Sequence, residues 1–253
     1  MKSIPVLIYH HVASKNGFLS ISKEIFEKQI EYLYKKGYYT LSAKEFFLFK
    51  QGKFNPPKNS VFLSFDDGWR DIYFFVYPIL KEYGLKATMF LVTSWVEKAS
   101  RKREDFYECN HKEAKQLVKT APGKVILNWD EIEKMKDVFD LHSHTHTHFE
   151  EKICIKEEFE ISKEILKKRL GIESKHLCWP RGYYNEMLLS IASSCGYQIF
   201  YTTKRGVNLP DNNMLEIKRI AVKPSVFWLK KSLFIYSSPI LTKIYLTLRK
   251  KHS

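Results

Sequence analysis

One short motif places two carboxylates side by side at the end of an apolar stretch. In Ser64-Phe65-Asp66-Asp67-Gly68 the two acids are neighbours, and neighbouring side chains of an extended chain point to opposite sides. One acid could therefore bind a cation while the other acts on a water molecule. An Asp-Asp-Gly turn without any function explains the same residues, and taken alone that ordinary interpretation is favoured.

A second motif places histidines at every second position of the segment 141–148. Histidines four residues apart can converge on one metal, and two pairs have this spacing, His142 with His146 and His144 with His148. A solvated loop that binds metals adventitiously is the alternative. One Asp and two His would make three protein ligands, the usual number for a catalytic zinc with an open position for water.

Two further motifs follow apolar runs. Cys178-Trp179-Pro180-Arg181-Gly182 contains a Pro and a Gly that fix a sharp turn, and Arg181 could hold a carboxylate there. An ordinary turn with a surface arginine is the alternative. His10 and His11 end the first apolar run of the chain. Functional residues of parallel α/β barrels gather at the carboxyl ends of the strands, and all four motifs come at such ends.

The elements that must position these motifs alternate along the chain. In several apolar runs, the odd and the even positions are both apolar. This pattern is typical of parallel strands that are covered on both faces. We expect strands at residues 4–12, 60–65, 87–92, 138–143, 176–179, 197–203 and 215–222. We expect helices after the caps Ser22, Ser42 and Asn128, a helix over 72–83 that Pro78 kinks or splits, and a helix over 155–170 that ends at Gly171. This alternation predicts a parallel sheet or barrel. The polar segment 97–127 is interpreted as an excursion on its surface.

Composition narrows the class of protein. The 253 residues include 44% hydrophobic and 15% aromatic residues, which excludes a disordered chain. Lys and Arg number 42 against 28 Asp and Glu, so the net charge is 42 − 28 = +14. No recognition motif accompanies this charge, so we expect no nucleic-acid partner, and a solvated basic surface is the ordinary explanation.

The end of the chain differs from the rest. Residues 1–224 are expected to form the barrel domain, and residues 225–253 a basic amphipathic helical segment in which apolar residues are mixed with Lys and Arg. This segment either closes the barrel as a helix pair or lies on a membrane surface. The N-terminus lacks the pattern of a signal peptide, no apolar stretch of about 18 residues occurs, and the four cysteines show no CxxC spacing. We therefore expect a cytoplasmic protein, peripheral at the inner face of the membrane if residues 225–253 bind it.

Together the motifs resemble the polysaccharide deacetylases of the NodB-homology class, carbohydrate esterase family 4. Residues 64–68 match the family's [TS]-F-D-D-G motif, residues 143–148 match S-H-[ST]-x-x-H, and residues 5–12 resemble the opening of one large subgroup. The resemblance extends from Ile4 to about Val222. It implies an α/β fold, an irregular (β/α) barrel of about seven parallel strands.

The resemblance also implies roles for single residues. Asp67, His144 and His148 would bind a divalent metal, with zinc as the default and cobalt or nickel as alternatives, and Asp66 would be the catalytic base. The third motif matches only in its Pro and Gly. Cys178 aligns with that motif's leading arginine, and we expect Arg181 to orient Asp66 instead.

The general acid is the role with the weakest match to the family. The late Leu-x-His motif that supplies it has no counterpart after Val222. The acid is therefore expected among His10, His142 and His146, with His10 favoured. His252 lies at the end of the chain and is a poor candidate.

The leading functional hypothesis is metal-dependent hydrolysis of N-acetyl groups from amino sugars of a cell-surface glycan or its lipid-linked precursor. The partner is then a glycan containing N-acetylated amino sugars. An O-acetyl esterase or another amide hydrolase on the same fold is the first alternative. A glycan-binding relative without catalysis is the second.

Overall fold

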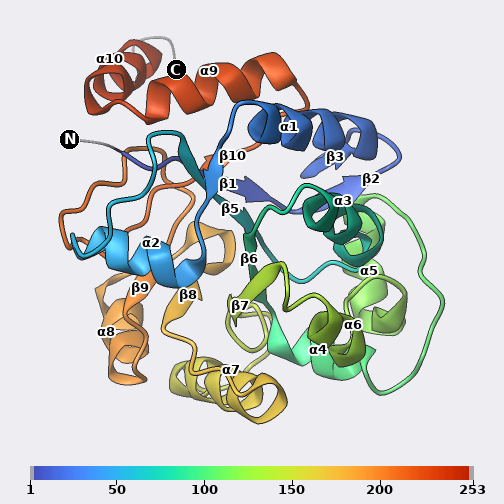
Figure 1. Cartoon of the computed structure of the whole chain (residues 1–253). Helices are drawn as coiled ribbons and strands as arrows, with labels where there is room; N and C mark the ends of the chain where they lie inside the picture. The colour runs from blue at the N-terminus through green and yellow to red at the C-terminus, as the bar shows by residue number, and fades with distance from the viewer. Residues whose placement is uncertain (1–2, 251–253) are drawn as a thin grey trace.

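A curled parallel sheet forms the centre of the molecule (Figure 1). The structure is a computed structural model that describes residues 3–250. The strands follow the order β10-β1-β5-β6-β7-β8-β9, and each pairs with its neighbour in parallel. Their bounds are β1 Val6–Tyr9, β5 Ser60–Phe65, β6 Ala87–Leu91, β7 Phe139–Ser143, β8 His176–Cys178, β9 Ile199–Tyr201 and β10 Ile220–Ala221. The expected irregular barrel of seven parallel strands is confirmed.

The two edges of this sheet meet through the segment before β10. Ile217 forms a parallel bridge with Tyr201 of β9, and its amide donates to the Phe200 carbonyl oxygen at 2.8 Å. Three residues later, Ile220 pairs with Leu7 of β1. The chain therefore joins β9 to β1 within a few residues, and we call residues 217–220 the seam of the barrel.

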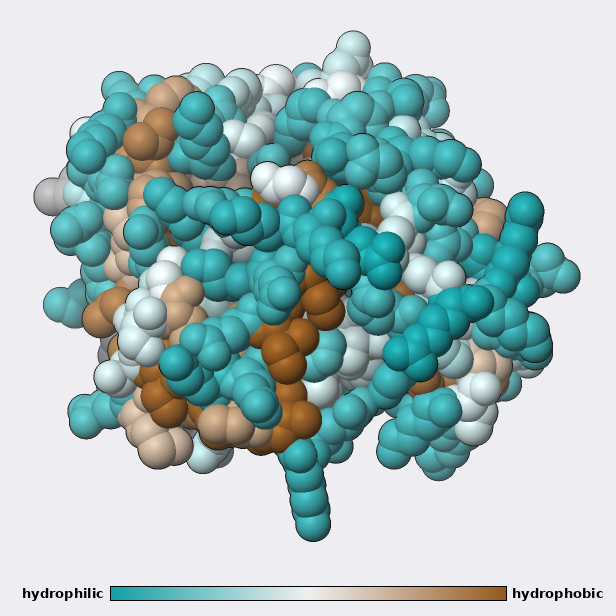
Figure 2. Space-filling view, turned by 90° about the horizontal axis from the view of Figure 1, so that it is seen from below, coloured by the Kyte–Doolittle hydropathy of each residue, from teal (hydrophilic) through white to brown (hydrophobic). Residues whose placement is uncertain are grey.

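Helices surround the sheet (Figure 1). Their bounds are α1 Lys23–Lys35, α2 Ala43–Lys50, α3 Tyr77–Glu82, α4 Thr93–Ala99, α5 His111–Thr120, α6 Trp129–Lys134, α7 Ile155–Leu170, α8 Glu186–Ser194, α9 Val226–Tyr236 and α10 Pro239–Lys250. Ser22, Ser42 and Asn128 cap α1, α2 and α6 as expected, each accepting a hydrogen bond from a backbone amide of the first turn. The face seen from the α7–α8 side is mainly hydrophilic, with a narrow hydrophobic strip (Figure 2), so these helices turn polar residues outward.

Two expected elements are divided. The strand expected over residues 4–12 breaks at His10, because the chain leaves the central sheet there and forms β2 (His11–Ala13), which pairs with β3 (Ser20–Ser22). The helix expected over residues 72–83 is split as Pro78 suggests. A π-helical turn over Ile72–Val76 precedes α3, which has the proline in its first turn. β4 (Tyr39–Thr40), a short strand beside the start of β5, was not expected.

The segment 97–127 is more than a surface excursion. It contains α5, whose Ala114 and Val118 are buried in the main hydrophobic core. The expectation of a purely superficial segment is therefore wrong: only one narrow face of α5 is apolar, and the surrounding polar residues hide it in the sequence.

The C-terminal residues form a helix pair. α9 lies beside α1 (Figure 1), and its Leu229, Leu233 and Tyr236 are buried in the same core as the strands. α10 follows with Ile240 and Ile244 exposed. The division into domains at residue 224 stays a prediction, and residues 1–2 and 251–253 lie outside the described residues. Among the residues that the structure describes, no helix has the length and apolar character needed to cross a bilayer.

Candidate metal centre

Asp67, His144 and His148 come together at the carboxyl ends of β5 and β7. The Nε2 atom of His144 lies 3.3 Å from Oδ1 of Asp67, and the Nε2 atom of His148 lies 3.6 Å from the same oxygen. In a tetrahedral zinc site with bonds of about 2.1 Å, two ligand atoms lie about 3.4 Å apart. All three side chains are buried. Their spacing and chemistry therefore fit a divalent cation of this size.

Neighbouring groups fix the direction of each ligand atom. His144 uses Nδ1 for the Cys178 carbonyl oxygen at 2.8 Å, and His148 uses Nδ1 for the Glu150 carboxylate at 3.3 Å. Trp69 donates Nε1–H to Oδ2 of Asp67 at 2.9 Å, which leaves Oδ1 to face the histidines. Such outer partners orient the ligands of metal sites and set the tautomer of their imidazoles.

The backbone of this cluster is strained where its side chains converge. Asp67, Thr145 and His148 have φ values of 76°, 68° and 63°, a left-handed region that costs a non-glycine residue about 1–3 kcal/mol. Gly68 also has a positive φ of 89°, and a Cβ there would lie 2.9 Å from Leu91. The Asp-Asp-Gly turn is therefore a shaped part of the site rather than an ordinary loop.

Asp66 lies next to the cluster and is held by a buried arginine. Arg219 donates from Nη1 to Oδ1 and from Nη2 to Oδ2 of Asp66, both at 2.8 Å, and is 0% exposed. Burial by itself raises the pKa of Asp66, but Arg219 and then His144 outweigh it and lower that pKa. Asp66 is therefore ionised at neutral pH and can accept a proton.

The expected role of Arg181 is corrected by this pair. Arg181 has 73% of its side chain exposed and forms an ion pair with Glu150 at 3.2 Å. Arg219 instead lies in the seam, between the buried residues Ile217 and Ile220. The predicted strand 215–222 contains three charged residues, Glu216, Lys218 and Arg219, so nothing in its sequence distinguishes the buried arginine from the other two.

Cys178 packs against the same pair. Its Sγ lies 2.9 Å from Nη2 of Arg219 and 3.6 Å from Oδ2 of Asp66. Asp66, His144 and Cys178 thus form a second group with the spacing of metal ligands. The guanidinium already bonds both Asp66 and Cys178, and a cation there would bring two like charges together. The group of Asp67, His144 and His148 is therefore the better cation site.

The three histidines considered as general acid occupy different places. His142 lies inside the barrel, stacked on His176 with a centroid distance of 4.2 Å, and burial lowers its pKa to about 3. His146 contacts Thr93 through Nδ1 at 3.0 Å. His10 is half-buried, and burial lowers its pKa; the charges of Asp66 and Asp67 oppose this effect only in part. Of the three, His10 is the one whose pKa is affected by both Asp66 and Asp67.

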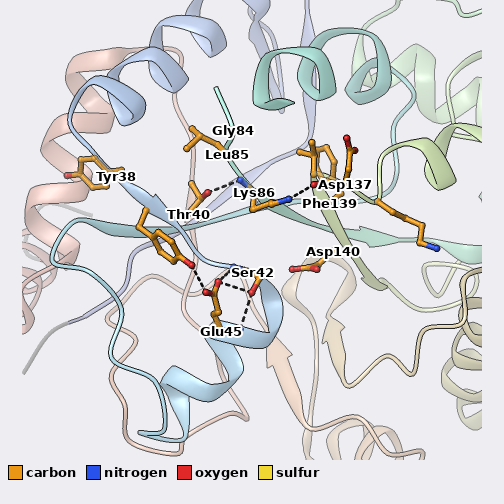
Figure 3. A pocket seen from close by; sticks show the side chains of 13 residues that line it. Tyr38, Thr40, Ser42, Glu45, Gly84, Leu85, Lys86, Asp137, Phe139 and Asp140 are labelled. Atoms are coloured by element: carbon orange, nitrogen blue, oxygen red, sulfur yellow. Dashed lines mark hydrogen bonds between the residues drawn. The ribbon is translucent and has the colours of Figure 1, made fainter. Parts of the chain in front are cut away.

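Another cavity lies at the opposite end of the barrel. It measures about 470 Å³ and is lined by residues before or at the starts of β4, β6 and β7, among them Thr40, Lys86 and Asp140 (Figure 3). Its polar groups serve local structure: Thr40 Oγ1 accepts from the Lys86 amide, and Glu45 caps α2 through Ser42. None of the expected site residues lines it. It faces away from the strand ends where barrels carry their chemistry.

Comparison with known proteins agrees with this fold. A family model described as polysaccharide deacetylase matches residues 53–200, more than half of the chain. The chain belongs to this family, the carbohydrate esterase family 4 deacetylases, and is a hydrolase.

Individual relatives cover most of the chain. It is 29% identical over 227 residues to the YxkH protein of Bacillus subtilis (strain 168), covering 88% of this chain and 72% of that protein. It is 29% identical over 239 residues to the poly-beta-1,6-N-acetyl-D-glucosamine N-deacetylase of Staphylococcus aureus (strain MSSA476), covering 87% and 79%. The solved structure of the Streptococcus pyogenes deacetylase PplD in complex with acetate is 28% identical with a TM-score of 0.75, covering 92% and 98%.

Proposed function

We propose that this chain removes N-acetyl groups from a polymer of N-acetylglucosamine by metal-dependent hydrolysis. The observation that carries the proposal is the convergence of Asp67, His144 and His148 beside a carboxylate, Asp66, that Arg219 keeps ionised. A binding module needs no such spare acid next to three ligands. The name of the S. aureus relative supports the choice of polymer.

Each residue of the site has a distinct task in this reaction. Asp67, His144 and His148 would hold the cation, which when bound polarises the acetyl carbonyl and activates water. Asp66 removes a proton from the attacking water, since it is ionised and buried. A protonated His10 gives a proton to the departing amine, so that it leaves as a neutral group. Zinc is the cation we propose, because the donor set is one carboxylate and two imidazoles.

The proposal is tested with the purified full chain and an N-acetylglucosamine pentamer with β-1,6 linkages. We expect acetate release from the pentamer, and we expect elemental analysis to find about one divalent metal per chain. Asp66→Asn should lower kcat by a factor of about 10² to 10⁴ and leave the metal content unchanged. Asp140→Asn is the control, because this acid lies in the cavity at the other end of the barrel and should leave kcat unchanged.

Three results would contradict this function. An Asp66→Asn protein with wild-type kcat would refute the assignment of the base. Acetate release from an O-acetylated glycan alone would show an esterase. A wild-type protein that binds the pentamer but releases no acetate under any metal would show a binding relative.

We also propose that the C-terminal helix pair holds the enzyme at an anionic membrane surface. Phe227, Phe234 and Ile240 are 75%, 70% and 73% exposed, and lysines and arginines share these helices. Exposed apolar residues beside cations are typical of helices that lie at a lipid interface. The substrate would then be a glycan close to the membrane, and the inner face of the membrane stays the predicted location.

Substitutions test the membrane proposal better than a deletion of the helix pair would, because α9 also contributes to the core through Leu229 and Leu233. In flotation with vesicles rich in phosphatidylglycerol, the wild type should float and the triple variant Phe227→Ser, Phe234→Ser, Ile240→Ser should not. Met187→Ser, which alters an exposed residue of α8, is the control. Equal flotation of the wild type and the triple variant would refute the membrane proposal.

A further inference from the structure

A groove lies beside the candidate metal centre, between residues 13–20 and residues 108–112. It measures about 520 Å³, within the range of cavities that hold small-molecule ligands. Glu108 joins its two walls, because its carboxylate accepts hydrogen bonds from the backbone amide and the hydroxyl of Ser14. The two walls of the groove are therefore connected to each other by hydrogen bonds.

The groove adjoins the candidate metal centre through shared lining residues and one buried ring. A smaller cavity, lined by His10 and His11, shares Gly17 and Ser20 with it. Trp69 forms the other link: its ring lies 5.6 Å from that of His111, which lines the groove, while its Nε1–H bonds the Asp67 carboxylate. Trp69 therefore contacts both the lining of the groove and the candidate metal centre, so the two places are neighbours.

The rim of the groove carries an exposed aromatic ring. Phe18 is 76% exposed and meets the ring of His111 edge-on at 5.6 Å. An aromatic ring at the rim of a cavity exposes apolar surface to water. A ligand that covers the ring buries this surface, which favours binding. The flat, apolar C–H face of a pyranose ring provides such a covering surface.

His111 is held in the groove by a chain of buried polar groups. Asp71 bonds Nδ1 of His11 at 2.5 Å, and Nε2 of His11 bonds Nδ1 of His111 at 3.1 Å. Both Asp71 and His11 are buried, and burial of such groups is costly unless they are hydrogen-bonded to one another, as they are here. The chain fixes the plane of the His111 imidazole and leaves Nε2 as its remaining polar atom.

We propose that this groove is a subsite for a second sugar of the glycan chain, next to the sugar that is deacetylated. Phe18 stacks on the face of that sugar, and Nε2 of His111 exchanges a hydrogen bond with one of its hydroxyl or acetamido groups. Among the described lining residues Glu108 is the one carboxylate, and it is occupied by Ser14. Lys15 and Lys112 also line the groove, so it offers hydrogen-bond donors to the hydroxyl and acetamido oxygens of an N-acetylated sugar. The inference rests on the proposed function and makes the enzyme selective for chains over single sugars.

The test compares two substrates, the β-1,6-linked N-acetylglucosamine pentamer and the methyl glycoside of N-acetylglucosamine. Phe18→Ala and His111→Ala should each raise the KM for the pentamer about 3- to 10-fold with little change in kcat, since they remove binding outside the reacting group. The kinetics of the methyl glycoside should not change. Phe227→Ala is the matched control, because Phe227 is 75% exposed on α9, and its KM for the pentamer should equal that of the wild type.

Failure of this inference can be told apart from failure of the proposed function. If the wild type is active and Phe18→Ala shows the wild-type KM for the pentamer, or a change of equal size for both substrates, the subsite is refuted while the deacetylase stands. If the wild type releases no acetate, calorimetric titration with the pentamer decides. Weaker binding by Phe18→Ala than by Phe227→Ala supports the subsite, and equal or absent binding overturns it.

Discussion

Replacing Arg219 by methionine should destabilise the protein and disable Asp66 at the same time. Arg219 forms two hydrogen bonds to the Asp66 carboxylate at 2.8 Å, and it also donates from Nε to the Thr202 carbonyl oxygen at 2.8 Å. Asp66 is only 3% exposed. Without the guanidinium, an ionised carboxylate would stay buried with no opposite charge bonded to it.

The size of the effect follows from that burial. Removing one partner of a buried ion pair costs about 3–5 kcal/mol. For a chain of this size each kcal/mol lowers the Tm by about 2–4 °C, so the loss should be about 6–20 °C. The pKa of Asp66 should rise, because burial raises it and Arg219 is the main group that lowers it. The acidic limb of the kcat/KM profile should therefore move to higher pH in the milder variant Arg219→Lys, which keeps a charge but loses the paired hydrogen bonds.

A double-mutant cycle isolates the pair. Urea unfolding of Asp66→Asn, Arg219→Met and the double variant should give a coupling free energy of about 2–4 kcal/mol, because the second substitution removes the uncompensated charge. Arg181→Met is the control, since that side chain is 73% exposed and should change stability and the pH profile little. A coupling below about 1 kcal/mol, with an unshifted pH profile in Arg219→Lys, would refute the reasoning.

Three further outcomes are expected. Dialysis against a chelator should abolish deacetylation and lower the Tm, and Zn²⁺ should restore both; full activity in the metal-free protein would contradict the cation site. The pKa of His142 is lowered to about 3 in the folded chain against about 6.5 when unfolded. The unfolded state therefore binds more protons between these values, and stability falls as pH drops below about 6.5. At pH 5 the loss from this one residue is about 2 kcal/mol, and urea titrations should show that His142→Phe removes it; an unchanged pH dependence would count against a neutral His142. Gly182→Ala should cost about 2–5 kcal/mol in urea unfolding, because a Cβ at its φ of 71° would lie 2.2 Å from Thr203 Oγ1; a loss below 1 kcal/mol would be inconsistent with this turn.

The sequence was sufficient to predict those parts of the site that lie on a single strand and on the turn after it. β5 spans Ser60–Phe65 as expected, so Asp66 and Asp67 necessarily lie at its carboxyl end. Likewise β7 ends at Ser143 and delivers His144 to the same edge. In these cases the strand, the turn and the functional residue are neighbours in the chain, and a local pattern suffices to place them.

The parts that depend on contacts between distant segments could not be predicted this way. His11 and His111 are hydrogen-bonded although 100 residues separate them, and neither the break of the first strand at His10 nor the buried face of α5 leaves a strong local pattern. Arg219 and Asp66 are 153 residues apart. Their meeting depends on how the barrel closes, and hydrophobic periodicity carries no information about closure.

The closure of the barrel also explains how Asp66, the proposed base, is paired with an arginine although Cys178 occupies the position that aligns with the arginine of the third motif. Cys178 ends β8, and Arg219 lies in the seam that joins β9 to β1, so the two side chains reach Asp66 from different segments of the barrel. What keeps Asp66 ionised and oriented is the position of the guanidinium beside its carboxylate. The segment of the chain that supplies the guanidinium does not change this effect. With the thiol 2.9 Å from Nη2 of Arg219, a second arginine at position 178 would place two cations in one buried space. The departure at Cys178 is thus compensated by Arg219, and it gives no reason to regard the chain as a relative that binds glycans without cleaving them.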